Sequence, residues 1–424
     1  MRRSFTVLAA LAALAIPSSA LAAPGISFGI QDDAWLHQAP LDARLETLDR
    51  LGPDVVRFTV RWDQVARKKP ARATNPNDKA YDWSGSDAIL RGLHQHHIAV
   101  LVTLFGAPRW ANGRHAANFI PRSKWTMPSF AVAVAKRYPW VRMWEIWNEP
   151  NLRTFLRPNS PRLYVTRLLN PTVAALHHVR RGMRVAGGAT SPRRTPSGMG
   201  PVQFMRGMSA ARARFDVYSH HPYPVSRVET PSKANCRYCT GILTMARLPD
   251  LLKEVRRDFG GKRVWLTEYG YQTNPPDRYL GVSRSLQAKY LAQAAYLAQK
   301  APRVDLLIHF LVKDERARGR WQSGLLSVRG VQKPSFWSFS IPLLQLSRSG
   351  ARTVLWGQVR ERRGRQRYVL QRVSGGHWRS VGGTRYTSSR GYFQRVVKAT
   401  HGARFRVLNL SDGRRTSSLS LTVS

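Results

Sequence analysis

The chain has 424 residues, of which 43% are hydrophobic and 13 are tryptophans. This composition excludes a disordered protein, and the length suits one large barrel with an appended module rather than one small domain. The charge is extreme, with 68 lysines and arginines against 24 aspartates and glutamates, a formal net charge of +44.

Such a charge would attract acidic polysaccharide, anionic cell-wall polymers or nucleic acid. The basic residues are spread along the whole chain and are not gathered on one helix face. A solvated, arginine-rich surface is therefore favoured over an anionic cell-wall or glycan partner, which stays the alternative, and nucleic acid is not expected as a partner.

Residues 1–22 have the pattern of an export signal. They combine a basic start, an apolar run from Phe5 to Ile16 and a small-x-small ending at Ala20 and Ala22. We expect cleavage after Ala22 and a secreted protein. The pair Arg2-Arg3 also matches a twin-arginine signal, so the general and the twin-arginine export routes both stay open. No later segment is apolar for long enough to predict a membrane span.

The next 325 or so residues repeat one pattern eight times: a short apolar run, a polar loop and a segment of helical periodicity. Eight such units predict an α/β fold, a (β/α)₈ TIM barrel over residues 23–349. The predicted strands are residues 25–30, 54–60, 98–105, 141–147, 183–189, 215–220, 263–268 and 304–311. The predicted helices are residues 41–52, 86–97, 127–138, 162–182, 200–211, 248–260, 283–300 and 333–347.

The fourth predicted strand ends in "WEIWNEPN". A barrel of this kind carries its chemistry at the carboxyl ends of its strands, so this strand delivers Asn148 and Glu149 to the barrel mouth. Pro150 has no amide hydrogen and stops the strand. It also biases Glu149 toward an extended backbone, which would direct the carboxylate into the mouth.

The two cysteines of the chain, Cys236 and Cys239, lie in "ANCRYCT", within a long polar loop. In an exported protein this spacing favours a small disulfide that staples the loop. A zinc site would need two further ligands at suitable spacing, and a redox motif would lie between a strand and a helix. No metal or organic cofactor is expected.

Glu268 ends the seventh predicted strand, in "VWLTEYGYQ", as Glu149 ends the fourth. Either glutamate alone would be read as a solvated loop charge. Two carboxylates on opposed strand ends are what glycosidic bond cleavage requires, because one donates a proton and the other acts as nucleophile or base. The pair favours a catalytic role over two unrelated loop charges.

Residues 350–424 differ in composition and carry short alternating runs separated by glycine-containing turns. They predict a small C-terminal β-sandwich, similar to fibronectin type III or bacterial immunoglobulin-like modules. Attachment to a wall or polysaccharide and a passive spacer are equal alternatives for its role.

The sequence from about residue 25 to 345 resembles the clan A glycoside hydrolases, which are retaining (β/α)₈ enzymes. "WEIWNEPN" is most similar to family 39 xylosidase-like members and next to family 5 cellulase-like members. The resemblance implies that Glu149 is the acid/base, that Glu268 is the nucleophile and that Asn148 binds the sugar 2-hydroxyl.

Three further residues match the same family pattern. Arg57, on the second strand, matches an arginine near the nucleophile, where a cation keeps a carboxylate ionised. Without that role, Arg57 would be an inward-facing side chain in an ordinary ion pair, and it would need an acidic partner nearby. His221 and Tyr223, in "SHHPYP", match a His-x-Tyr, and Tyr223 would orient Glu268. His220 is the alternative if the register differs by one, and either histidine could be a packed loop residue.

Aromatic residues line sugar sites because the faces of pyranose rings are apolar. Trp62, Trp110 and Trp144 are the candidates, with a core role open for Trp144. Similar enzymes commonly end the eighth strand with a tryptophan beneath the sugar, whereas "LLIHFLVKDE" offers His309 and Phe310.

These residues together predict a secreted glycoside hydrolase that cleaves a β-linked glycan or oligosaccharide by double displacement. The alternative, which the strand-eight departure supports, is a catalytically impaired barrel that binds carbohydrate at the cell wall. The sequence does not distinguish chain-end from internal cleavage.

Overall fold

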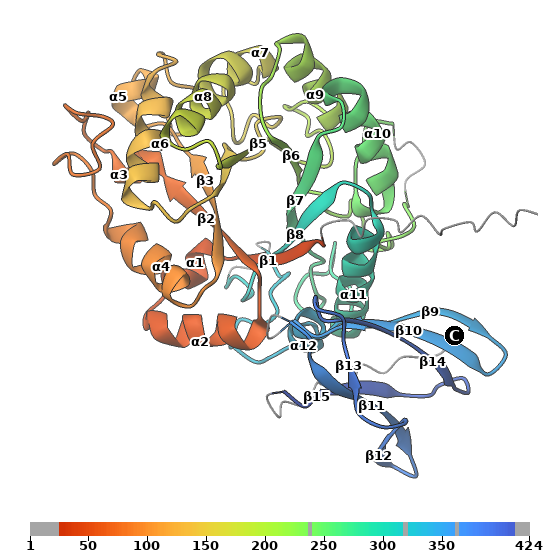
Figure 1. Ribbon diagram of the computed structural model, residues 1–424. Coiled ribbons are helices and arrows are strands. Elements are labelled where there is room, and N and C mark those ends of the chain that lie inside the picture. The colour runs from red at the N-terminus through yellow and green to blue at the C-terminus, as the bar shows by residue number, and fades with distance from the viewer. Residues whose placement is uncertain (1–24, 236–239, 317–320, 361–363, 412–424) are drawn as a thin grey trace, which may run out of the picture.

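A computed structural model describes residues 25–235, 240–316, 321–360 and 364–411. It consists of a closed eight-stranded parallel barrel and a smaller all-β part (Figure 1). The predicted fold class, a (β/α)₈ barrel followed by a small β domain, is confirmed. The predicted export signal at residues 1–22 and the predicted disulfide between Cys236 and Cys239 lie outside the described residues.

Every predicted barrel strand overlaps an observed one. The barrel closes because β1 pairs in parallel with both β2 and β8, with Gly29 opposite Val55 and Ile308. The strands are β1 (Ser27–Gln31), β2 (Val55–Arg61), β3 (Ala99–Phe105), β4 (Met143–Ile146), β5 (Arg184–Thr190), β6 (Val217–His220), β7 (Arg263–Tyr269) and β8 (Val304–Phe310).

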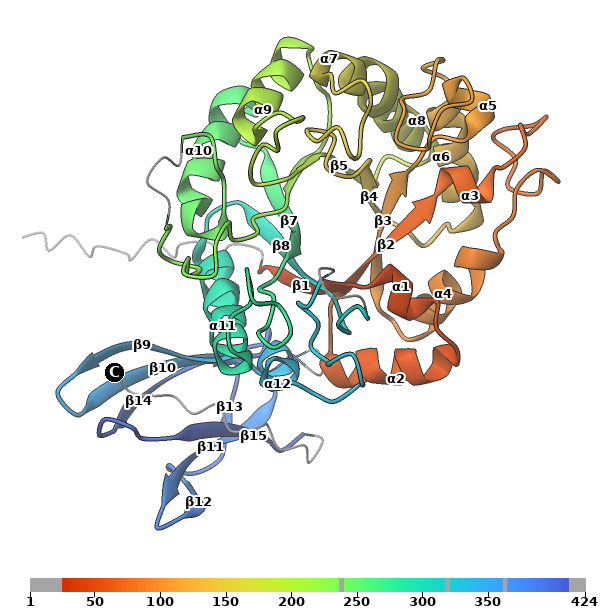
Figure 2. The same cartoon turned by 180° about the vertical axis from the view of Figure 1, so that it is seen from behind.

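The helices form a ring outside the strands, as Figure 2 shows. Among the described residues, none of them combines the length and the apolarity that a bilayer crossing needs. The longer helices are α2 (Leu41–Leu51), α4 (Ser84–Gln95), α6 (Thr126–Arg137), α8 (Asn170–Val179), α9 (Pro201–Ala210), α10 (Leu248–Phe259), α11 (Arg284–Lys300) and α12 (Pro334–Ser340). The short ones are α1 (Asp33–Leu36), α3 (Trp62–Val65), α5 (Arg109–Asn112), α7 (Pro161–Leu163), the π-helix η1 (Tyr164–Leu169) and the 3₁₀-helix η2 (Met245–Arg247).

The barrel interior changes from apolar to polar along the strands. Residues two apart on a strand point to the same side, so Val55 and Arg57 both face inward. Val55 belongs to an apolar cluster inside the barrel, whereas Arg57 bonds inward-facing Glu145 one layer nearer the carboxyl ends. The apolar cluster comprises Val55, Leu101, Ala186, Val217, Trp265, Leu306 and Ile308. This layer is a floor beneath the polar layer that carries the candidate site.

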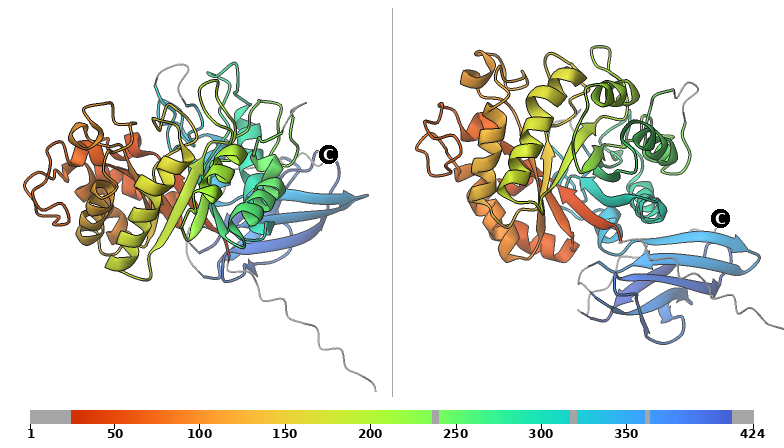
Figure 3. Two further views of the ribbon diagram at one scale, coloured as in Figure 1. Left: turned by 90° about the horizontal axis from the view of Figure 1, so that it is seen from above. Right: turned by 45° about the horizontal axis from the view of Figure 1, so that its top comes forward.

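The appended part has two antiparallel sheets that lie one over the other beside the barrel (Figure 3). Tyr368 and Phe393 stack between them with ring centroids 4.4 Å apart. Trp356 reaches Tyr296 on α11, 5.3 Å away. The first sheet has the order β14-β10-β9, from β9 (Leu343–Ser349), β10 (Arg352–Gln358) and β14 (Tyr392–Lys398). The second contains β11 (Arg367–Ser374), β12 (His377–Ser380), β13 (Arg385–Tyr386) and β15 (Phe405–Asn409).

The last predicted helix, residues 333–347, is wrong beyond Ser340. Helix α12 ends there, and Leu343–Ser349 is a strand that pairs with β10. The physical reason is Pro342, which disfavours helical backbone angles at Ile341, where φ is −136° and ψ is 77°. The appended sheets therefore include the last 7 residues of the predicted barrel segment.

Tyr164 connects η1 to the two strands on either side of the candidate acid. Its hydroxyl donates to the carbonyl oxygen of Ile146, at 2.8 Å, and accepts from the amide of Gly188, at 3.1 Å. Both partners belong to buried residues, Ile146 at the end of β4 and Gly188 within β5. The loop after β4 is thus held to β5 by one buried hydroxyl.

We expect Tyr164→Phe to lower the free energy of unfolding by about 1–3 kcal/mol, because it leaves a buried amide without its acceptor. Urea unfolding followed by tryptophan fluorescence measures this. Tyr296→Phe is the control, since that tyrosine contributes a ring contact, and it should cost less than about 0.5 kcal/mol. Equal losses in both variants would contradict the role given to the Tyr164 hydroxyl.

Candidate active site

A cavity of about 820 Å³ opens at the carboxyl ends of the barrel strands. Gln31 at the end of β1, Glu268 on β7 and Phe310 at the end of β8 all line it. Asn148 and Glu149 line it from the loop that follows β4. The structure therefore brings the two predicted catalytic glutamates into one cavity.

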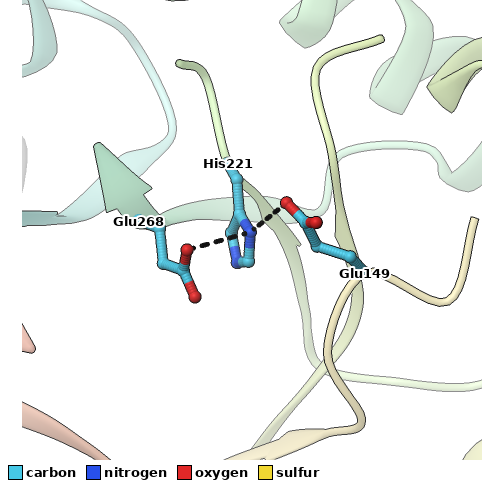
Figure 4. A group of neighbouring side chains, drawn as sticks. All are labelled: Glu149, His221 and Glu268. Atoms are coloured by element: carbon cyan, nitrogen blue, oxygen red, sulfur yellow. Dashed lines mark hydrogen bonds and ion pairs between the residues drawn. The ribbon is translucent and has the colours of Figure 1, made fainter. Parts of the chain in front are cut away.

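Glu149 and Glu268 face each other across His221 (Figure 4). His221 Nδ1 lies 2.9 Å from Glu149 Oε1 and 3.6 Å from Glu268 Oε2. One oxygen of each carboxylate and a ring nitrogen of His221 all lie within 4.8 Å of one another. This is close to the carboxyl separation of about 5–5.5 Å that a covalent intermediate requires, and below the roughly 6.5–9.5 Å that admits a water.

Arg57 is fully buried beside the candidate nucleophile, as expected from the sequence. Its Nη1 donates to Glu268 Oε1 at 2.5 Å and also bonds Gln31. Its Nη2 donates to Asn148 Oδ1 at 2.8 Å, and its Nε donates to Glu145 Oε2 at 2.7 Å. Burial would lower the pKa of Arg57, but the charges of Glu145 and Glu268 raise it. The arginine is thus held as a cation.

Glu145 is the acidic partner that an inward-facing Arg57 requires, and sequence reasoning missed it. It lies inside β4, four residues before Glu149, and is completely buried. Burial would raise the pKa of its carboxyl, but the charges of Arg57 and then His221 outweigh burial and lower it. The available signal was the alternation of "MWEIW", which places Glu145 on the inward side of β4.

Tyr223 donates its hydroxyl to Glu268 Oε2 at 2.9 Å, as the resemblance implied. Burial and the charge of Glu268 raise the pKa of Tyr223 far above its usual value, so it stays a donor. The structure also shows which of the two candidate histidines lies in the site. His220 contacts Thr190 and the carbonyl oxygen of Leu243, and burial lowers its pKa to about 3. His221 is the one that reaches the site.

The environment of Glu149 favours its protonated form. Burial is the largest influence and raises the pKa of its carboxyl, and the charge of Glu268 adds to that effect. The hydrogen bond and charge of His221 act in the opposite direction without reversing it. Burial would also lower the pKa of His221, but the charges of Glu268 and Glu149 raise it.

The predicted extended backbone of Glu149 is wrong. Its φ is +37°, and Trp147 and Ala189 also have positive φ, at 73° and 43°. The tertiary structure overrides the preference that Pro150 imposes, because the amide of Glu149 donates to the carbonyl oxygen of Ala189 at 2.9 Å. Strained backbone of this kind gathers at functional sites, where the surrounding structure holds it.

The predicted tryptophan platforms do not lie in the cavity. Trp62 begins α3, turns outward and stacks on Phe130, 5.7 Å away. Trp110 donates Nε1–H to the carbonyl oxygen of Ala66 at 2.7 Å. Trp144 is completely buried in the core between strands and helices. Apolar packing outside the barrel decides the place of all three tryptophans. The prediction that they contact the sugar is therefore wrong, and they are core or supporting residues.

Trp321 supplies the aromatic surface that the eighth strand lacks. It lines the cavity beside Phe310, whose predicted place is right, and its ring lies 5.4 Å from that of Phe310 and 4.8 Å from that of Tyr223. Sequence reasoning missed it because it looked for a tryptophan at the strand end. Trp321 follows β8 by a loop, and a solitary tryptophan in a polar loop is the signal that could have found it.

A buried ion pair holds the segment that carries Trp321. Lys333 Nζ donates to Asp314 Oδ1 at 2.7 Å, to Thr273 Oγ1 at 2.9 Å and to the carbonyl oxygen of Gln322 at 3.1 Å. Burial lowers the pKa of Lys333 and raises that of Asp314, although each opposes the other's shift. The pair anchors the main chain next to Trp321.

Within the described residues, one group of side chains could offer a metal ion three ligands, and it is Glu149, His221 and Glu268. Their donor atoms already have protein partners: Arg57 and Tyr223 bond the two oxygens of Glu268, and His221 bonds Glu149. The absence of a metal and of a cofactor stays a prediction.

No family model and no curated protein matches the chain. Solved structures do match. A monomeric β-xylosidase from Caulobacter crescentus CB15 has a TM-score of 0.58 at 16% identity, over 88% of this chain and 94% of that one. The chain therefore shares its fold with this enzyme. A family 39 glycoside hydrolase from Bacteroides cellulosilyticus WH2 has a TM-score of 0.58 at 16% identity, over 89% of this chain and 79% of that one. The GH39 enzyme from Xanthomonas axonopodis pv. citri has a TM-score of 0.57 at 14% identity, over 89% of this chain and 92% of that one.

His221→Phe should raise the pKa of Glu149 further, because the carboxylate loses a donor and a nearby positive charge. Titration of the carboxyl carbon by ¹³C NMR, assigned with Glu149→Gln, measures the shift. Tyr223→Phe is the control, since it removes a hydrogen bond from the other carboxylate and should move the pKa of Glu149 far less. An unchanged pKa in His221→Phe would sink the assignment.

Proposed function

We propose that the protein is an exported retaining glycoside hydrolase that acts on a β-linked glycan. The observation that carries the proposal is the pair of carboxylates within 4.8 Å, in unequal surroundings. Burial raises the pKa of Glu149 and favours its protonated form, whereas Glu268 accepts hydrogen bonds from both Arg57 and Tyr223. One acid and one nucleophile at this spacing suit double displacement.

In the first step, Glu268 attacks the anomeric carbon while Glu149 gives its proton to the departing oxygen. The bond between the sugar and its leaving group breaks, and an ester bond to Glu268 forms. Once the ester has formed, Glu268 no longer carries a negative charge, and Arg57 loses one of its two carboxylate partners. Its hydrogen bonds to Glu145 and Asn148 keep the guanidinium in place.

In the second step, Glu149 is a carboxylate and takes a proton from a water, whose oxygen attacks the anomeric carbon. The ester to Glu268 breaks, and the sugar leaves with its original configuration. His221 donates to Glu149 Oε1, which stabilises the carboxylate between the two steps. Glu149 thus acts as an acid in the first step and as a base in the second while it keeps His221 as its partner.

Sugar binding rests on Asn148 and on the aromatic group around Trp321. Asn148 Oδ1 accepts from Arg57, which fixes the amide and leaves Nδ2 to donate to a sugar 2-hydroxyl. Trp321 and Phe310 offer apolar faces to a pyranose ring. Because Trp321 replaces the missing strand-eight tryptophan, the main sequence-based reason for a purely sugar-binding barrel is removed. The matched β-xylosidase makes an aryl β-xyloside the first substrate to test.

Glu268→Gly should lower turnover of an aryl β-glycoside by about 10⁴-fold or more, because no covalent intermediate can form. Azide can enter the vacated space and attack in its place, so the product should be the inverted glycosyl azide. Product configuration is read by ¹H NMR of the anomeric proton.

Glu149→Ala is the matched variant, and it should behave differently. An activated aryl leaving group needs little protonation, so the first step survives and the glycosyl-enzyme accumulates. Azide should restore turnover with retained configuration. If the two variants gave azide products of the same configuration, the two roles would be wrong.

Trp321→Ala should lower kcat/KM for the same substrate by about tenfold, or ~1.4 kcal/mol, because a stacked sugar face loses its partner. Initial-rate kinetics measure the change. Trp125→Ala is the control, since Trp125 is 64% exposed and lies at the start of α6, outside the cavity. Comparable losses in both variants would remove Trp321 from the site.

A further inference from the structure

The two sides of the cavity around the glutamates differ in chemistry. In the closed order of the eight strands, β3 and β4 lie across the barrel from β7 and β8, as Figure 2 shows. On the β7 and β8 side, Gln272, Glu315 and Trp321 line the cavity. Glu315 accepts from the amide of Trp321 at 2.8 Å. This side therefore combines an aromatic ring with groups that can bond the hydroxyls of a sugar.

The side next to the candidate acid is apolar. Phe105, Leu152 and Phe155 line the cavity there, and we name these three residues the apolar wall. Phe105 ends β3. Leu152 and Phe155 lie in two successive turns that begin at Glu149, because the amide of Leu152 donates to the carbonyl oxygen of Glu149 at 2.9 Å and that of Phe155 to Leu152 at 3.0 Å. The apolar wall is thus part of the same loop as the acid.

The surrounding structure holds the apolar wall in place. Arg61 donates to both carboxylate oxygens of Asp63 at 2.8 Å, and its guanidinium lies 5.3 Å from the ring centre of Phe105. Gly106 gives this pair room, since a Cβ at that position would lie 2.4 Å from Asp63 Oδ1. The carbonyl oxygen of Phe155 accepts from Trp147 Nε1 at 2.7 Å. A ligand that contacts the wall therefore meets an ordered surface, which favours affinity.

The leaving group of the substrate has to lie at the apolar wall. Its oxygen must come within hydrogen-bond reach of Glu149, which protonates it. Glu268 attacks the anomeric carbon from the opposite side, so the leaving group extends away from Glu268. A sugar stacks best on one flat aromatic face, but the rings of Phe105 and Phe155 are inclined at 69° to each other. An apolar group, in contrast, gains from burial against any of these side chains.

We propose that the apolar wall binds an apolar leaving group, so that the substrate is a sugar or glycan β-linked to an apolar alcohol such as an alkanol or a phenol. The inference rests on the proposed function and names the group that Glu149 protonates. The polar side with Trp321 would hold the sugar. A second sugar in place of the alcohol would instead rely on Ser191 and Thr195, which line the cavity from the loop after β5.

Binding of alkyl 1-thio-β-glycosides, which resist hydrolysis, tests the inference by isothermal titration calorimetry. The ligands are the ethyl, butyl and hexyl members of a β-xyloside and a β-glucoside series. Each added CH₂ should lower the dissociation constant about twofold, because the wall covers one side of the chain, whereas complete burial would give about fourfold. In Phe155→Ala the gain should fall to less than about 1.3-fold per CH₂, and Phe155→Leu should keep most of it.

Two variants are matched controls. Phe119→Ala removes a half-buried ring from the loop after β3 that does not line the cavity, and it should leave the dependence on chain length unchanged. Trp321→Ala should weaken every member of a series by the same factor, because it acts on the sugar.

The inference is wrong if affinity does not rise with chain length, if Phe155→Ala keeps the full rise, or if neither series binds. Tighter binding of a thio-linked disaccharide than of the hexyl compound would replace the alcohol with a sugar. Binding needs no bond cleavage. A protein that shows the rise but hydrolyses no β-glycoside would therefore refute the proposed function alone, and turnover without the rise would refute this inference alone.

Discussion

The arrangement of the candidate site depends on one buried cation. A guanidinium inside a barrel is costly unless every hydrogen bond and the charge are matched. Arg57 meets that condition with Gln31 on β1, Glu145 on β4, Asn148 after β4 and Glu268 on β7. One side chain thereby ties three strands and sets the orientation of the nucleophile. Removing it would deprive two buried carboxylates of the guanidinium that both of them contact, so the same interaction serves folding and chemistry.

The charges around Arg57 explain how two nearby glutamates keep different roles. Glu145 and Glu268 both accept from the arginine, and the lowered pKa of Glu145 favours its carboxylate form. Glu149 has no bond to Arg57 among the described contacts and bonds His221 instead. Its raised pKa follows from burial, which outweighs the opposing effects of His221 and of the charge of Arg57. His221, beside both glutamates, offers a positive charge when Glu149 gives up its proton.

The strand ends were predictable because their signals are local. Period-two apolar runs mark strands, and a polar residue at the end of a parallel strand reaches the barrel mouth, so Glu149 and Glu268 could be placed from sequence. Trp321 could not, since its position depends on a buried ion pair 12 residues further along at Lys333 and on how a loop returns to the cavity. Trp62 was misplaced because an aromatic residue just past a strand end can turn either into the mouth or onto an outer helix. The helix predicted across Pro342 is wrong because the proline, and not the apolar periodicity, decides the backbone at Ile341.

The attachment of the appended domain keeps the barrel mouth clear. Arg360 is buried beneath the barrel, where its guanidinium lies 3.7 Å from the ring centre of Phe28 near the start of β1. Its Nη1 donates to the carbonyl oxygen of Phe339 at 2.7 Å, and burial lowers its pKa to about 10. The start of β1 is the amino end of the barrel, whereas Glu268 and the cavity lie at the carboxyl end. The appended domain therefore attaches at the end of the barrel opposite the cavity, and none of its described residues lines the cavity.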